Sequence, residues 1–203
     1  MAFTREQLTE YLSTTPKVII DLGCGPTKRP GSLGIDHADL PGVDFVADLE
    51  VGLGFLPDNS VDDIYNSHFL EHIENLEQLL SEIHRCLKPG GRLHVVVPHF
   101  SNPYYYSDYT HKKFFGLYSF DYFSGLDYGY RRKTPSYNKS FRFRILSRRL
   151  IFRSPSSFVI NLMKKHILTR LFNSSKYMQS VYEESFCYTF PCYELIMEME
   201  AMK

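Results

Sequence analysis

Three acidic residues follow short apolar segments in the first quarter of the chain, where they could bind a nucleoside. Asp21 ends one segment and leads into Gly23-Cys24-Gly25, whose two glycines would let a ligand approach the backbone. Asp36 ends the next, where a carboxylate can accept both ribose hydroxyls of an adenosine cofactor. Asp48, before Leu49, ends a third and could receive the adenine amino group. Together these positions predict an adenosine-cofactor site.

The glycine loop and its acidic neighbours have two other interpretations. A dinucleotide-dependent dehydrogenase also carries such a loop after its first strand, but its fingerprint needs a third glycine, and Lys28 stands there. Alternatively, the acidic residues only cap solvated turns. The cofactor site is favoured because three consecutive segments end in the same way.

Histidines follow two later apolar segments and could accept a proton. His99 comes directly after a predicted strand over 92–97, and His68 follows one over 61–66. Ligands of open α/β sheets bind at the carboxyl ends of the strands, so substrate should meet cofactor there. Because imidazole can take a hydroxyl proton near neutral pH, we predict His99 as general base, with His68 and His111 as further candidates. The equal alternative is that His99 only hydrogen-bonds the loop backbone.

His68, Glu71 and His72 have the spacing i, i+3 and i+4. This spacing places three side chains on one face of a helical turn, where they could hold a metal ion. The more common explanation is packing at the start of a helix, so the sequence predicts no metal.

Short apolar segments alternate with helical patterns through the first hundred residues. Strands are predicted over 17–21, 33–36, 43–47, 61–66 and 92–97. Thr4 and Gln7 have capping-box spacing and predict a helix to Ser13, and the apolar spacing from Phe69 to Leu87 predicts another. The alternation indicates an α/β fold, a Rossmann-like open and mostly parallel sheet with helices on its faces.

The amino-acid composition of the chain changes after Pro98. Residues 101–130 contain eight Tyr and four Phe, too many for a linker. A strand is predicted over 140–153, a basic amphipathic helix over 158–172 and a final strand or hairpin over 186–199. We therefore expect one domain, 1–203. Its cofactor-binding core covers about 15–100 plus a C-terminal strand, 185–200, and an aromatic, basic insert over about 101–184 covers the substrate.

Charge is balanced overall but unevenly distributed. Lys plus Arg and Asp plus Glu number 23 each, which excludes a nucleic-acid protein that relies on overall basicity. Residues 111–170, however, hold 14 basic and 2 acidic side chains. The basic residues of interest are Lys112, Lys113, Arg131, Arg132, Lys133, Arg142, Arg144, Arg148, Arg149, Lys164 and Lys165. Such a stretch favours an anionic partner.

The four cysteines and the hydropathy pattern bear on location. Cys24, Cys86, Cys187 and Cys192 lie in a chain too large to need disulfides, so we expect reduced thiols and a cytoplasmic protein. No segment approaches the roughly 18 apolar residues of a membrane span, and the first residues lack a signal-peptide pattern.

Four motifs in order give the chain a family resemblance. They are Asp21-Leu22-Gly23-Cys24-Gly25, then 56–62 (Leu-Pro-Asp-Asn-Ser-Val-Asp), 67–73 (Ser-His-Phe-Leu-Glu-His-Ile) and 87–93 (Leu-Lys-Pro-Gly-Gly-Arg-Leu). The chain resembles class I S-adenosylmethionine-dependent methyltransferases of the type 11 group. The resemblance covers residues 17–100 and implies a seven-stranded sheet whose last strand is antiparallel.

The resemblance also implies roles for individual residues toward S-adenosyl-L-methionine. It places Asp21, Gly23, Cys24 and Gly25 beside the methionine part of the cofactor, Asp36 at the ribose, Asp48 and Leu49 at the adenine, and Asn66 to His68 on the methyl-donor side.

The chain departs from this family in one connection. Only about ten residues separate Asp21 from Leu33, too few for the usual helix, so a tight loop must connect the first two strands. The missing helix removes an N-terminal dipole, and we expect Lys28 or Arg29 to neutralise the cofactor carboxylate instead. Part of one sheet face should be bare unless the N-terminal helix, the insert or a second subunit covers it.

The sequence therefore predicts a transferase that methylates oxygen or nitrogen of an anionic, sugar-containing acceptor. Segments 98–103 and 109–115 resemble short methyltransferases associated with polysaccharide biosynthesis. RNA or another small molecule is the alternative acceptor, and a second alternative is a non-catalytic cofactor-binding protein that docks through its basic face. Peripheral membrane contact and a homodimer stay open.

Overall fold

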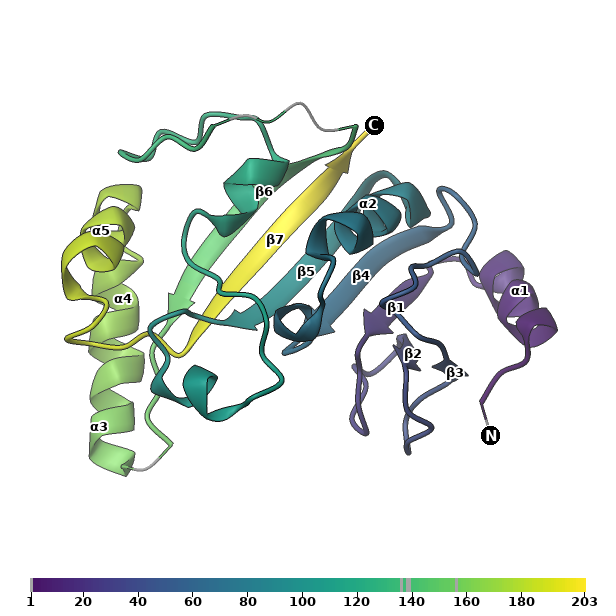
Figure 1. The fold of residues 1–203 in the computed structure, drawn as a ribbon, viewed down its shortest axis with the longest axis horizontal. Helices are drawn as coiled ribbons and strands as arrows, with labels where there is room; N and C mark the ends of the chain where they lie inside the picture. The colour runs from purple at the N-terminus through teal and green to yellow at the C-terminus, as the bar shows by residue number, and fades with distance from the viewer. Residues whose placement is uncertain (1, 136, 138–139, 156) are drawn as a thin grey trace.

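A seven-stranded sheet runs through the centre of the molecule (Figure 1). The computed structural model describes residues 2–135, 137, 140–155 and 157–203. The strands are β1 (Ile19–Leu22), β2 (Leu33–Asp36), β3 (Phe45–Val46), β4 (Val61–Ser67), β5 (Leu87–Pro98), β6 (Arg142–Ile151) and β7 (Glu194–Met202), in the spatial order β3-β2-β1-β4-β5-β7-β6. Strands β1 to β5 pair in parallel, whereas β7 is antiparallel to β5 and β6. The predicted fold class is confirmed.

Two strands differ from the predicted bounds. β3 has two residues instead of five, because the chain turns at Pro41 and Gly42 just before it. β5 begins at Leu87, so Gly90 and Gly91, which were expected to end the preceding helix, lie within the strand. A side chain on Gly91 would put a Cβ 2.9 Å from the Lys88 carbonyl oxygen and 3.0 Å from that of Asp62. Glycine is therefore required where β5 leaves the helix and joins β4.

Two helices flank the first half of the sheet. α1 (Arg5–Thr14) has the predicted capping box, in which Thr4 and Gln7 each accept a backbone hydrogen bond from the other. α2 (Leu76–Cys86) is shorter than the predicted 69–87 helix. A 3-10 turn, η1 (Leu70–His72), precedes it, and Asn75 caps α2 by accepting from the Gln78 N–H. The apolar periodicity spans two elements because both face the same core.

The connection from β1 to β2 is the predicted tight loop, and residues 23–32 contain no helix. The loop is held by side chains of the strands it joins. The Asp21 carboxylate accepts from the Arg29 N–H at 2.8 Å, and the Asp36 carboxylate accepts from the Gly25 N–H at 2.9 Å. Strand-end carboxylates thus replace a helix in ordering this connection.

The missing helix leaves one face of the sheet half-exposed. The buried face carries Leu93 and Met199 and packs against α2, whose His84 meets the Phe143 ring edge-on at 5.4 Å. On the opposite face Tyr65 and His94 stack at 4.1 Å, and the Arg29 guanidinium from the tight loop lies 3.8 Å above the Tyr65 ring. Charged side chains occupy the rest of this face, including the ion pairs Arg92–Glu198 and Arg144–Glu200.

The segment 101–184 contributes to the sheet as well as to its surroundings. It contains the 3-10 turns η2 (Pro103–Ser107) and η3 (Ser119–Phe123) and the edge strand β6. After β6 come α3 (Phe158–Met163), the π-helical turn η4 (Lys164–Leu168), α4 (Thr169–Phe172), α5 (Lys176–Val181) and a second π-helical turn, η5 (Tyr182–Phe186). The predicted 158–172 helix matches the run from α3 to α4. The predicted final strand begins only at Glu194, because the chain turns over 187–193.

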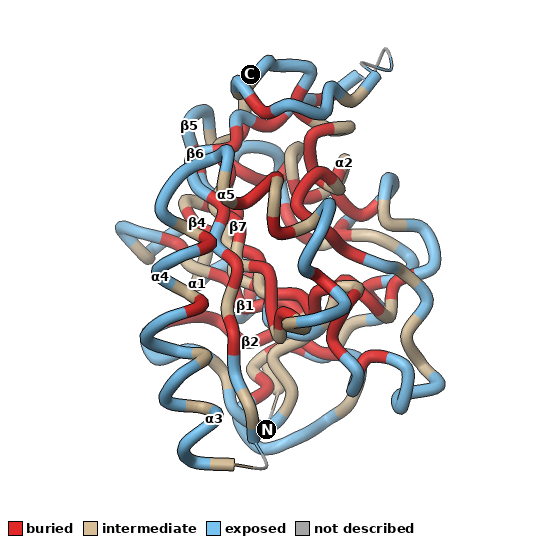
Figure 2. Tube along the Cα trace, turned by 90° about the vertical axis from the view of Figure 1, so that its left-hand side faces the viewer, coloured by how far each residue is buried: buried red, intermediate tan, exposed pale blue. Residues whose placement is uncertain are grey.

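Buried residues gather along the strands, whereas α3 and α4 are largely exposed (Figure 2). Aromatic residues of the insert extend the core, and the Phe115 and Phe120 rings stack at 5.5 Å with about 1% of each residue exposed. All four cysteines are free thiols, as expected. Within the described residues, no helix has the length and apolar character needed to cross a bilayer.

We predict that the buried ion pair between Arg148 and Asp121 stabilises the insert. The guanidinium bonds both carboxylate oxygens, at 2.6 and 3.2 Å, and donates to the Leu117 carbonyl at 2.8 Å. Arg148→Ala would leave Asp121 buried without a partner, so urea unfolding should show a loss of about 3–5 kcal/mol. Arg144→Ala, which breaks an exposed pair on the same strand, should cost less than about 1 kcal/mol. Equal losses in the two variants would contradict the prediction.

Candidate cofactor and acceptor site

A cavity of about 760 Å³ lies at the carboxyl ends of β1 to β4. It is lined by Gly23, Asp36, His37, Asp48, Leu49, Glu50, His68, Phe69, His72, Ile73 and Thr110. Five of these were predicted cofactor residues: Gly23, Asp36, Asp48, Leu49 and His68. The parallel strands thus bring together residues that are far apart in the sequence.

Asp36 is an acidic group of the cavity that two backbone hydrogen bonds hold in place. Its Oδ2 accepts from the Gly25 N–H at 2.9 Å, and its Oδ1 accepts from the Ala38 N–H at 3.1 Å. The His37 Nδ1 lies 3.0 Å from the same Oδ1. Two backbone donors fix the carboxylate, which is suited to accept hydrogen bonds from a diol.

Gly23 shapes the wall of the cavity next to β1. Its φ of +66° belongs to the left-handed region that favours glycine. A Cβ on Gly23 would lie 2.3 Å from the Phe69 ring, which also lines the cavity. Any other residue would push this ring out of place, so the two residues define one wall together.

Asp21, Cys24, Gly25, Lys28 and Asn66, the other predicted cofactor residues, do not line the cavity in the part of the chain that the structure describes. The Lys28 ammonium pairs with Asp44 at 2.5 Å, and Arg29 stacks on Tyr65, so both cations are engaged elsewhere. Burial raises the pKa of the Cys24 thiol to about 11, which keeps the thiol protonated at neutral pH.

Asn66 has an unusual environment at the end of β4. The residue is 2% exposed, and neither its amide oxygen nor its amide nitrogen has a hydrogen-bond partner among the described residues. A buried amide without partners is costly. Asn66 lies two residues before His68, which lines the cavity, so the unpaired amide is buried behind the cavity wall.

His68 is held in a strained backbone conformation between two carboxylates. Its φ of +54° lies in the left-handed region, which is uncommon for a residue other than glycine. Its Nε2 lies 3.0 Å from Glu194 and its Nδ1 lies 3.4 Å from Glu71. The hydrogen bond to Glu194 and then the nearby Glu71 carboxylate raise the pKa of the imidazole to about 9. His68 is therefore a cation at neutral pH and a poor proton acceptor.

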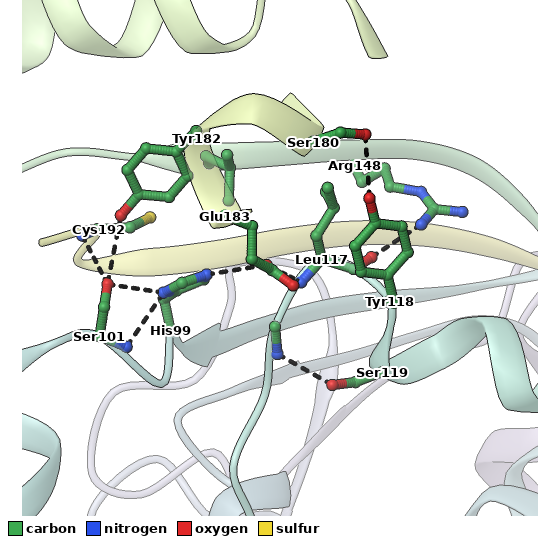
Figure 3. Close-up of polar contacts among 12 residues, drawn as sticks. His99, Ser101, Leu117, Tyr118, Ser119, Arg148, Ser180, Tyr182, Glu183 and Cys192 are labelled. Carbon is green, nitrogen blue, oxygen red and sulfur yellow. Dashed lines mark hydrogen bonds and ion pairs between the residues drawn. The ribbon is translucent and has the colours of Figure 1, made fainter. Parts of the chain in front are cut away.

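His99 is not among the residues that line the cavity. Figure 3 shows its ring between Ser101 and Glu183. It is fully buried, and its Nδ1 accepts from the Ser101 N–H at 3.1 Å. The proton therefore lies on Nε2, which donates to Glu183 at 3.2 Å. Glu183 also accepts from the Leu117 N–H. With both ring nitrogens engaged, the geometry favours the alternative in which His99 orders the loop rather than accepts a substrate proton.

His111 does come close to the cavity. Its ring meets the His72 ring edge-on at 4.8 Å, and Thr110, the preceding residue, lines the cavity with His72. Sequence reasoning did not assign His72 to the cofactor cavity, although His72 stands in the 67–73 motif. Nothing in the sequence pointed to Glu50, because its position depends on how the loop after β3 turns.

A second cavity, of about 430 Å³, lies between the end of β6 and the helices that follow it. Its walls include Arg149, Arg153, Lys165, His166 and Arg170, and no acidic residue is among them in the described chain. Glu194 connects it to the first cavity, because its Oε1 pairs with His68 and its Oε2 lies 3.3 Å from Arg153.

The remaining basic residues of the 111–170 stretch are dispersed. Arg148 is buried with Asp121, and Lys112 pairs with Glu50 and Glu74. Arg131 and Arg132 lie over the rings of Tyr177 and Tyr118, at 5.8 and 5.4 Å from their centres. The basic stretch is therefore not one surface.

Comparison with known sequences gives one family match. Residues 35–95, which run from the end of β2 into β5, match a methyltransferase-domain family, and no curated protein sequence matches the chain. The matched residues include Asp36, Asp48 and His68 of the cavity.

Solved structures share the fold at low sequence identity. The YcgJ protein of Bacillus subtilis superposes with a TM-score of 0.55 and 16% identity, covering 98% of this chain and 99% of that one. A SAM-dependent methyltransferase from Archaeoglobus fulgidus gives 0.51 and 19%, covering 97% and 92%. The protein solved in complex with the Haloferax volcanii Trm112 methyltransferase activator gives 0.53 and 15%, covering 97% and 88%. The family match is to a methyltransferase domain, and the fold is shared with a structure described as a SAM-dependent methyltransferase.

We predict that His99→Ala lowers stability and leaves the cofactor cavity intact. The change removes the partner of Glu183 and of the Ser101 N–H, both of which lie in a largely buried network. Thermal and urea unfolding should show a loss of about 1–3 kcal/mol, the usual cost of unpaired buried groups. His166→Ala, at an exposed histidine, should change stability little. If His99→Ala is as stable as wild type but loses turnover, His99 is catalytic after all.

Proposed function

We propose that the protein transfers the methyl group of S-adenosylmethionine to oxygen or nitrogen of an anionic, sugar-containing acceptor. The observation that carries the proposal is the 760 Å³ cavity at the carboxyl ends of β1 to β4, whose acidic residues fall within the methyltransferase-family match. The cofactor supplies a methyl group activated on a positively charged sulfur. The protein must bind it, orient it and place an acceptor beside it.

The cavity residues fit the parts of this cofactor. Asp36, fixed by two backbone N–H groups, would accept the ribose hydroxyls. Asp48 would accept from the adenine amino group, and Leu49, 3% exposed, would contact the adenine ring. Asn66 offers a buried amide without partners, which the amino and carboxyl groups of the methionine part would satisfy.

The second cavity supports an anionic acceptor. Four cationic side chains, Arg149, Arg153, Lys165 and Arg170, line it, and no acidic residue is among its described lining residues, although Arg153 pairs with Glu194. Guanidinium groups bind phosphates and carboxylates with paired hydrogen bonds. Glu194 spans the distance to His68, so an acceptor held here by its anionic group would extend toward the cofactor cavity.

Exposed tyrosines between the two cavities favour a sugar-containing acceptor. Tyr104, Tyr106 and Tyr109 are 50%, 63% and 97% exposed and come just before Thr110, which lines the first cavity. Tyr104 lies edge-on to Tyr193 at 6.3 Å, and Arg153 lies over the same Tyr193 ring. Flat aromatic faces beside cations can stack on sugar rings and bind their charged substituents.

A lipid-linked acceptor is favoured by the surface of the α3–α4 helical run. Phe158, Val159 and Ile167 are 81%, 74% and 59% exposed, and Lys164 and Lys165 lie on the same run. An exposed apolar surface with lysines is typical of peripheral contact with an anionic membrane. The half-exposed face of the sheet would allow a homodimer. RNA remains an alternative acceptor for the basic cavity.

We expect Asp36→Asn to weaken S-adenosylmethionine binding about tenfold or more. The neutral amide keeps one acceptor oxygen but presents an N–H toward hydroxyls or backbone donors, so one to two hydrogen bonds, each worth roughly 0.5–1.5 kcal/mol, are lost. Isothermal calorimetry measures the affinity, and Asp39→Asn is the matched control because Asp39 is exposed on the following loop. Unchanged affinity in Asp36→Asn would refute the cofactor assignment.

We expect replacement of Arg149 and Arg170 together by Ala to raise the KM for a phosphorylated or acidic acceptor. Two partly exposed contacts, each worth up to about 1 kcal/mol, correspond to a change of roughly tenfold that shrinks with added salt. The affinity for the cofactor should not change. Replacing Arg131 and Arg132, which lie outside this cavity, is the matched control.

The outcomes separate the candidate functions. A larger effect at Arg131 and Arg132 would move the acceptor site to their surface. Binding of RNA that falls linearly in log affinity against log salt would favour RNA. Cofactor binding without formation of S-adenosylhomocysteine across an acceptor panel would favour the non-catalytic binding protein.

A further inference from the structure

Three side chains from two separate segments converge beside the cofactor cavity. Glu71 and His72 belong to η1, which follows β4, and His111 comes from the insert. The Lys112 and Lys113 N–H groups both donate to the Glu71 carbonyl, at 2.7 and 3.1 Å, which holds the insert against η1. As a result one ligand atom from each of Glu71, His72 and His111 lies within 4.8 Å of the other two.

Glu71 is an acidic group whose burial needs an explanation. The residue is fully buried, and neither carboxylate oxygen has a hydrogen-bond partner among the described residues. Its Oε1 lies 3.4 Å from the His68 Nδ1, close enough for an ion pair but without hydrogen-bond geometry. His68 is already hydrogen-bonded through Nε2 to Glu194 at 3.0 Å. His68 therefore offers one positive charge at Oε1, whereas Oε2 has no partner among the described residues, and a bound metal cation would stabilise it.

Both histidines are oriented so that their Nε2 atoms are available. The His111 Nδ1 donates to the Tyr105 carbonyl at 2.9 Å, which places the proton on Nδ1. The Thr110 hydroxyl donates to Asp108 at 2.6 Å, so it accepts from the His72 Nδ1 at 2.9 Å. With Nδ1 of each ring used as a donor, Nε2 is the ring nitrogen left to bind a ligand. Metal-binding histidines are oriented by the same kind of outer hydrogen bond.

We infer that Glu71, His72 and His111 form a binding site for a divalent transition-metal ion such as Zn²⁺. Two imidazole nitrogens and one carboxylate are the ligand set of open zinc sites, whereas Mg²⁺ prefers oxygen ligands only. Metal–ligand distances of about 2.0–2.2 Å bring ligand atoms within roughly 4.2 Å of one another, so modest side-chain movement completes the site. The exposed Asp108, whose Oδ2 lies 3.6 Å from the His111 Nε2, adds favourable negative charge.

This site differs from the one that the sequence spacing offered. His68 was the third member of that set, but its Nε2 is engaged by Glu194, and His111 takes its place from the insert. His72 lines the first cavity, so a metal ion held by His72 would lie beside it and could act on an acceptor bound there. That role rests on the proposed methyl transfer, whereas metal binding itself does not.

The test is metal binding by the purified full-length chain after treatment with a chelator. Zn²⁺ is titrated against a chromophoric chelator, and Co²⁺ absorption reports the ligand set. Wild type should bind one equivalent and show a raised Tm with excess Zn²⁺. Loss of an outer-sphere partner typically weakens metal affinity about 10- to 100-fold. Thr110→Val should weaken Zn²⁺ affinity by about that factor, and His111→Ala, which removes a ligand, should weaken it more.

Control variants keep the inference falsifiable. His166→Ala and His94→Gln change histidines elsewhere and should bind Zn²⁺ as wild type does. Glu71→Gln is a further ligand variant, and circular dichroism with unfolding curves shows whether each variant is folded. Binding that is absent in wild type, or equal in His111→Ala and His166→Ala, overturns the metal site. S-adenosylmethionine affinity, measured separately without metal, tests the proposed function independently.

Discussion

Parallel pairing of β1 with β2 and β4 fixes the positions on which the cofactor cavity depends. Leu22 pairs with Ile35 on one side and with Asn66 on the other, so β1, β2 and β4 end at the same edge. The residues that follow, Gly23 and His68, must then lie close together, and each leaves its strand with a positive φ. Backbone hydrogen bonding in the sheet therefore does most of the positioning, and side chains need only short loops to reach the ligand.

The ten-residue connection between β1 and β2 explains several features that would otherwise look unrelated. Without a helix, the loop is held by Asp21 and Asp36, whose carboxylates accept from backbone N–H groups. Arg29 lies over Tyr65 on the face that a helix would cover, and Lys28 pairs with Asp44. The loop thus uses its own cations to order itself, and each would have to leave its partner to meet the cofactor carboxylate that the sequence had assigned to it.

The features that could be predicted from the sequence are those that depend on residues close together in the chain. The capping box at Thr4 and the strand over 33–36 followed from residue types and spacing, whereas the antiparallel last strand was implied by the family resemblance. The role expected for His99 depended on its position after β5, and the structure shows a partner, Glu183, that lies 84 residues away. Such contacts between distant segments leave no signal in a single sequence. The position of His111 also depends on a contact between distant segments. The Lys112 and Lys113 N–H groups donate to the Glu71 carbonyl and hold His111 near Glu71.

Electrostatics connects the two cavities and the candidate metal site. His68 lies between Glu71 and Glu194, and the second oxygen of Glu194 lies beside Arg153. A cation bound by Glu71 would weaken the hold of Glu71 on His68, because the two positive charges would repel. His68 would then be held mainly by its ion pair with Glu194, the carboxylate that also pairs with Arg153. Glu71, His68, Glu194 and Arg153 thus form one continuous line of alternating charges between the two cavities.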